Sequence, residues 1–184
     1  MANSFITKRA LAEALKQLMK EVPFNKINIA DICEKCGMNR KSFYYHFKDK
    51  YDLVNWIFDT EFVETARNTT YKTQWELIGA LCDYFYKNKD FYRYAFEIQG
   101  QNSFSEHFFD TIKPLLYRRI KEVMPDEEIL DYQIIAIAEF FVIITQKWIT
   151  EKDCVPPEKF QHSVKTMVEK FATQIHNEIG KNDI

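Results

Sequence analysis

Apolar residues recur at intervals of three and four along most of this chain, with charged and polar residues between them. That spacing is typical of amphipathic helices, and the first one is predicted over residues 5–21. This helix is expected to end before Pro23, because proline disfavours helical geometry in the residue before it. Asn28 is expected to cap a short second helix that ends at Gly37, since asparagine and glycine are favoured at these two helix ends.

The helical pattern continues to the end of the chain. Asn39 is expected to cap a helix from Arg40 to Phe47, so two short helices follow one another across a glycine-containing turn. Further helices are predicted over residues 51–66, 73–88, 90–99, 104–123, 127–151 and 157–179. No segment shows the strict alternation of a strand, so the predicted fold class is all-α.

The composition is that of an ordinary globular protein: 184 residues, 46% apolar, with only 4 Gly and 5 Pro. The apolar run from Ile134 to Ile144 is shorter than the roughly 18 residues that a membrane span needs, and Glu139 interrupts it. The N-terminus lacks an apolar segment followed by a cleavage site. We therefore expect a cytoplasmic protein with no membrane partner, whose four cysteines are thiols.

Charge is distributed unevenly along the chain. Residues 1–56 contain ten Lys or Arg and six Asp or Glu, whereas the other 128 residues contain fifteen and twenty-one. A basic first segment joined to an acidic body suggests a small module that binds a polyanion.

The helix after Asn39 has the residues that DNA reading requires. A helix-turn-helix lays its second helix in the major groove, so one face must be buried and the other polar. Phe43 and Phe47 are spaced for the core. Arg and Lys can donate to guanine, and tyrosines can contact thymine methyl groups or phosphates. Lys50 begins the next helix, where free backbone N–H groups favour a phosphate oxygen.

Residues 5–56 resemble the DNA-binding domain of the tetracycline-repressor (TetR) family, most clearly over residues 29–53, IADICEKCGMNRKSFYYHFKDKYDL. The sequence NRKSFYYHF at residues 39–47, followed by YDLVNW at residues 51–56, also resembles the branch that contains regulators of dihydroxyacetone kinase operons. The resemblance implies a helix-turn-helix domain at residues 1–50 and a helical effector-binding and dimerisation domain at residues 51–184. It implies a homodimeric repressor that binds a palindromic operator in double-stranded DNA and responds to an unidentified small molecule.

The residues of the predicted DNA interface follow from the same match. The resemblance places Tyr44, Tyr45, His46 and Lys50 at backbone-contacting positions. It places residues 39–42, together with the two tyrosines, where bases are read. Asn28 stands where the family usually has Thr, and it can still cap the helix and reach a phosphate. The full predicted set is Asn28, Asn39, Arg40, Lys41, Ser42, Tyr44, Tyr45, His46 and Lys50.

Two further sites are predicted in the second half. A carboxylate within an apolar helix is unfavourable unless it is paired, exposed or kept for a ligand, so Glu139 is the leading effector candidate. Polar residues near the glycine break complete the predicted effector site: Gln99, Asn102 and His107, with Phe96, Phe104 and Phe108 as its walls. The predicted dimer interface comprises Ile137, Phe141, Ile144, Trp148, Val164, Met167, Val168 and Phe171.

Other function classes fit less well. The four histidines (46, 107, 162 and 176) stand in no recognisable catalytic motif, so an enzyme is not predicted. Cys33 and Cys36 could form a metal or redox pair, but zinc needs four ligands, and we expect a buried thiol at Cys33 with no metal or cofactor. The alternative that stays open is an interaction protein or co-activator that pairs with a second regulator and binds DNA weakly or not at all.

Overall fold

The computed structural model describes residues 2–98, 100, 102–123 and 131–182. Those residues contain helices and no strand, which confirms the predicted all-α fold. The helices are α1 (Ala2–Met19), α2 (Ile29–Lys35), α3 (Arg40–His46), α4 (Lys50–Phe58), α5 (Glu64–Arg67), α6 (Gln74–Lys87), α7 (Lys89–Glu97), α8 (Phe104–Val123), α9 (Asp131–Thr150) and α10 (Pro157–Asn182).

Two shorter turns complete the list. A 3-10 turn, η1 (Phe24–Lys26), follows α1, and a π-helical turn, η2 (Asp59–Val63), separates α4 from α5. The sequence predicts one helix over residues 51–66, so this π turn is a difference. A π turn contains one residue more than an α-helical turn. Two contacts with distant helices accompany it, since Asp59 bonds to α8 and Glu61 bonds to α1. The periodicity of the sequence does not show such contacts.

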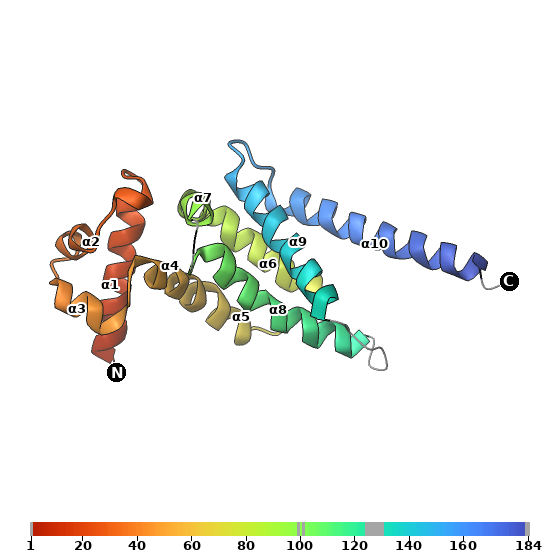
Figure 1. Cartoon of the computed structure of the whole chain (residues 1–184), viewed down its shortest axis with the longest axis horizontal. Coiled ribbons are helices and arrows are strands. Elements are labelled where there is room, and N and C mark those ends of the chain that lie inside the picture. The colour runs from red at the N-terminus through yellow and green to blue at the C-terminus, as the bar shows by residue number, and fades with distance from the viewer. Residues whose placement is uncertain (1, 99, 101, 124–130, 183–184) are drawn as a thin grey trace.

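The molecule is elongated (Figure 1). Helices α1 to α3 form a compact head at one end, and α6 to α9 form a helical body. Helix α10 packs along α6 and then extends away from the head. Helix α4 runs from the head into the body, and it contacts both α1 and α8. It begins at Lys50, next to the predicted domain boundary, which stays a prediction.

One continuous apolar core joins head and body through α4. Leu53 and Val54 are buried among the residues of the head's core, and Phe58 lies at the centre of an aromatic cluster in the body. The Phe58 ring stacks on Phe85 at 5.8 Å between centroids and meets the edge of Phe104 at 5.4 Å. The head is therefore connected to the body by a packed helix rather than by a linker alone.

By length and composition alone, helix α9 is long and apolar enough to cross a membrane. It packs against α8 and α7 on one side. Ala138 and Val142 on one face are buried, while Ile137 and Ile143 on the other are exposed. The protomer therefore leaves part of an apolar helix uncovered.

Candidate nucleic-acid interface and effector pocket

Backbone caps set the position of α3. The Asn39 side chain accepts a hydrogen bond from the Ser42 amide at 2.9 Å, which satisfies a donor at the start of the helix. Gly37 turns the chain between α2 and α3 with a φ of 68°, a conformation that glycine adopts without strain. The predicted cap and turn at these two positions are confirmed.

The Asn28 cap of α2 is also confirmed. Its Oδ1 accepts from the amides of Ala30 and Asp31 at 2.8 and 3.1 Å, and the Asp31 carboxylate accepts from the Asn28 amide in return. This reciprocal capping box fixes the start of α2 and engages the oxygen of the Asn28 side chain. A phosphate contact by Asn28 is thus left to its amide NH2 group.

The centre of the outward face of α3 consists of Lys41 and two tyrosines. Phe43 and Phe47 are buried in the head, whereas Lys41, Tyr44 and Tyr45 are exposed, Tyr45 by 82% of its surface. At 100° per residue, these three exposed residues span only about 100° of the helix circumference. They form the surface that a major groove would meet first.

The other predicted residues of α3 flank that face. Arg40 is exposed at the first helical position, while Ser42 and His46 are half-buried. The His46 ring meets the Tyr45 ring edge-on at 4.9 Å between centroids, so it supports the tyrosine from the side. Four predicted residues of α3, namely Arg40, Lys41, Tyr44 and Tyr45, are thus exposed on neighbouring positions of the helix, whereas Ser42 and His46 lie at its half-buried edge.

Lys50 is bonded within the head. Its Nζ donates to the carbonyl oxygens of Phe24 and Ile27, both at 2.7 Å, and lies 4.4 Å from the centre of the Phe24 ring. Desolvation lowers the Lys50 pKa, and two of its three N–H donors are used inside the head. Lys50 thus connects α4 to η1, a contact that the sequence did not predict, and a phosphate contact through its third donor stays a prediction.

This contact predicts a stability effect. Lys50→Met should lower the free energy of unfolding by about 2 kcal/mol, because hydrogen bonds from a charged donor to buried carbonyls are lost. Urea titration followed by circular dichroism measures it, with Lys48→Met at the exposed neighbouring lysine as the control. Unchanged stability together with weakened DNA binding in Lys50→Met would instead support the phosphate role.

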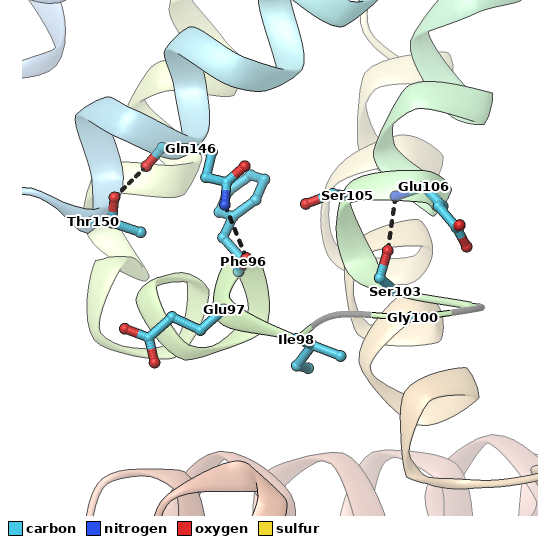
Figure 2. Close-up of a pocket in the computed structure, with 9 residues that line it drawn as sticks. All are labelled: Phe96, Glu97, Ile98, Gly100, Ser103, Ser105, Glu106, Gln146 and Thr150. Atoms are coloured by element: carbon cyan, nitrogen blue, oxygen red, sulfur yellow. Dashed lines mark hydrogen bonds between the residues drawn. The ribbon is translucent and has the colours of Figure 1, made fainter.

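A pocket of about 640 Å³ opens between the end of α7, the start of α8 and the last turns of α9. Figure 2 shows Gln146 and Thr150 of α9 across the opening from Glu106 of α8 and from Ser103, which directly precedes that helix. Gln146 donates to the Phe96 carbonyl at 3.1 Å, and Ser103 accepts from the Glu106 amide at 3.3 Å. The lining is mostly polar, with two carboxylates, from Glu97 and Glu106.

The predicted effector residues are placed differently. Glu139 is exposed on α9 and lines no part of this pocket, so its side chain reaches solvent without a ligand. The His107 ring bonds to Asp59 at 2.8 Å, which uses it within the fold. Asn102 lies next to the pocket with a positive φ of 65° but does not line it, and Gln99 lies outside the described residues.

The predicted walls are only partly correct. Phe96 lines the pocket, but Phe104 and Phe108 are buried in the aromatic core. Sequence reasoning missed Gln146 and Thr150, although two polar residues four apart in an apolar helix were a signal for a shared polar face.

The predicted dimer residues fall into two groups. Ile137, Met167, Val168 and Phe171 are exposed in the protomer, Phe171 by 67%, and Phe141 and Ile144 are half-buried. Trp148 and Val164 are instead buried. The Trp148 ring stacks on Phe160 at 4.3 Å and its Nε1 donates to the Val155 carbonyl, so its surface is already covered within the protomer. The assignment of these two buried residues to an interface was wrong.

The cysteines are free thiols in the described residues. Cys33 is buried, and the Cys36 thiol donates to the Ile32 carbonyl at 3.2 Å. Burial raises the pKa of both thiols, and it raises that of Cys82 to about 12. No cluster of three or more metal-ligating side chains occurs among the residues described.

Comparisons with protein families match both halves of the chain. The family described as bacterial regulatory proteins, tetR family, matches residues 11–57. The family described as a transcriptional regulator C-terminal region matches residues 73–170. The first match covers most of the head together with α4, and the second covers most of the body and part of α10.

Individual relatives point in the same direction. The HTH-type dhaKLM operon transcriptional activator DhaS of Lactococcus lactis is 34% identical over 111 residues, 59% of this chain and 57% of that protein. The match thus spans little more than half of that relative.

Two solved structures share the fold. A dihydroxyacetone kinase operon activator DhaS has 23% identity and a TM-score of 0.65, over 90% of this chain and 96% of the other. A TetR transcriptional regulator from Streptococcus agalactiae 2603V has 20% identity and a TM-score of 0.69, over 91% and 96%.

Proposed function

Because the chain belongs to the tetR family of bacterial transcriptional regulators, we propose that it binds a palindromic DNA operator as a homodimer and changes transcription in response to a small molecule. The observation that carries this proposal is the exposed face of α3, where Lys41, Tyr44 and Tyr45 stand together above a buried aromatic base. Such a regulator acts in the cytoplasm, where its DNA is.

Each exposed residue of α3 has a role that fits its chemistry. The Lys41 ammonium can donate to guanine O6 or N7 at the floor of the major groove. The Tyr44 hydroxyl can donate to a phosphate oxygen, and Tyr45 can press on a thymine methyl group. Arg40, on the flank, is placed for a phosphate or a neighbouring base.

Selection from a pool of random-sequence duplexes tests the proposal directly. The full chain should enrich a two-fold symmetric site, because a symmetric dimer presents two identical heads to the DNA. If the chain is instead an interaction protein that pairs with a second regulator, no site should be enriched by the chain alone.

Substitutions on α3 separate positioning from base reading. Lys41→Ala should lower affinity by about 1–3 kcal/mol and relax the preference at one base position per half-site. Tyr44→Phe should weaken binding to all variants of the site equally, because a phosphate contact carries no base information. Binding of each protein to single-base variants of the selected site measures this. An unchanged ranking in Lys41→Ala would remove its base-reading role.

The dimer is proposed on the uncovered apolar surface of α9 and α10. Ile137 on α9 and Met167, Val168 and Phe171 on α10 are exposed, and exposed apolar surface of this kind is typical of an interaction site. A second copy of the chain supplies the complementary surface in a two-fold dimer, because each protomer offers the same residues.

Effector binding is proposed in the pocket between α7, α8 and α9. A small polar molecule fits its lining of hydroxyl, amide and carboxylate groups better than an apolar one does. The bond from Gln146 to the Phe96 carbonyl ties α9 to α7 at that point, so a ligand that displaces the amide would loosen the two helices.

The direction of regulation is a separate proposal. The family resemblance favours a repressor, whereas the L. lactis relative is named an activator of the dhaKLM operon. We propose that the chain controls genes of dihydroxyacetone use. A reporter gene placed behind the selected operator distinguishes the two directions, since a repressor lowers its expression and an activator raises it.

A further inference from the structure

An ion pair connects the first helix of the head to the π turn at the entrance of the body. The Lys16 Nζ on α1 lies 2.5 Å from Glu61 Oε1 on η2, and the ammonium lies 5.7 Å from the Phe91 ring of α7. The Lys16 and Glu61 side chains are exposed by only 16% and 33%. Lys16 is therefore largely, and Glu61 partly, withdrawn from water.

A chain of two tyrosine hydroxyls leads to the other oxygen of the same carboxylate. The Tyr84 hydroxyl on α6 donates to Glu61 Oε2 at 3.0 Å and lies 2.6 Å from the Tyr92 hydroxyl on α7. Because the Tyr84 proton is directed to Glu61, Tyr92 is the donor in the second bond. Burial raises the pKa of both tyrosines, so both hydroxyls stay protonated as this arrangement requires.

The π turn is held on a second side as well. Asp59, two residues before Glu61, bonds to His107 of α8 at 2.8 Å. Residues two apart on a helix point in nearly opposite directions, so η2 has one carboxylate bonded to α8 and the other bonded to α1 and α6. The segment that joins head to body is thus fixed by polar contacts on two faces.

We propose that the Lys16–Glu61 pair, oriented by the hydroxyls of Tyr84 and Tyr92, positions the DNA-reading head relative to the body. Lys16 and Glu61 are then positioning residues for operator binding, an inference that rests on the proposed function. A partly buried ion pair adds little net stability, because desolvation offsets much of the attraction. Its hydrogen bonds are directional, however, so it restricts the head to fewer orientations than an apolar contact does.

The first measurement needs no DNA. A nitroxide attached through an unnatural amino acid at exposed Lys35 of α2 leaves the native cysteines untouched. Pulsed electron paramagnetic resonance on the dimer then gives the distribution of distances between the two heads. Glu61→Gln and Lys16→Met should broaden this distance distribution. Lys16→Arg keeps the charge, so its distribution should stay as narrow as that of the wild type. Glu64→Gln, an exposed carboxylate in the next turn, is the matched control and should change nothing.

The second measurement compares a complete operator with an isolated half-site, both taken from the duplex selection. Glu61→Gln should bind the complete operator about 3- to 30-fold more weakly, in the range of mutations that alter coupling between sites. It should bind the half-site as well as the wild type does, because each head is intact and only the spacing of the two is less defined.

The outcomes separate this inference from the proposed function. Absence of any dipolar signal in the wild type, or of any enriched operator, contradicts the dimer or the DNA binding. A wild type that meets both expectations while Glu61→Gln keeps a narrow distance distribution overturns the positioning role. Equal weakening on the complete operator and the half-site also overturns it, since that result describes a damaged head.

Discussion

Phe171→Asp should leave the chain monomeric and weaken operator binding by at least about a hundredfold. Phe171 is exposed on α10 beside Val168, so the substitution disturbs little within the protomer. In the proposed dimer it places a carboxylate in an apolar contact, where an unpaired charge is strongly unfavourable. A monomer engages one half-site only and loses the gain of bivalent binding, which is commonly 10²- to 10⁴-fold.

Sedimentation equilibrium gives the oligomeric state, and titration of the selected operator gives the affinity. Val155→Asp is the matched control, because Val155 is also an exposed apolar residue but lies in the turn before α10. A Phe171→Asp protein that remains dimeric, with native helicity and unchanged operator affinity, would place the interface elsewhere.

Phe58→Ala should reduce the free energy of unfolding by about 3–5 kcal/mol. The Phe58 ring is buried at the end of α4 and packs on Phe85, Phe104 and Phe108 at centroid distances of 5.4 to 5.8 Å. Its removal leaves a cavity where the head joins the body, and rigid aromatic neighbours cannot close it.

Urea unfolding at one fixed protomer concentration measures this effect, since dimerisation makes apparent stability depend on concentration. Phe5→Ala is the control: Phe5 is 46% exposed and meets the Trp56 ring only at 6.1 Å, so the expected loss is about 1 kcal/mol or less. Equal losses in the two variants would contradict the central place of Phe58 in the core.

The head was predictable because its signals are local. Asn28, Gly37 and Asn39 specify helix ends within three or four residues of themselves. The spacing of Phe43 and Phe47 then fixes which face of α3 is buried, and so which residues are exposed. Every step in that inference uses neighbours along the chain.

Contacts between distant residues were not predictable in this way. Lys50 bonds to carbonyls 26 and 23 residues earlier, and Glu61 meets Lys16 across 45 residues. Periodicity carries no information about such partners, so the π turn at residues 59–63 was also missed.

Helix α9 shows a third kind of error. Its apolar residues lie nearly all round, and the sequence therefore suggested Glu139 as a candidate ligand contact and Trp148 as interface surface. The structure reverses part of this: Glu139 is exposed and Trp148 is covered by Phe160. An apolar pattern alone does not distinguish a face buried within the protomer from one left for a partner.

Hydroxyl-radical footprinting of the full chain on its selected operator tests the central claim most directly. The account predicts two equivalent protected patches related by the symmetry of the site, with the α3 helices in major grooves about 34–36 Å apart or at a multiple of that spacing. It also predicts loss of that protection when Lys41 and Tyr44 are both replaced by Ala. A single asymmetric patch at saturating protein, or protection that the double substitution leaves intact, would contradict it.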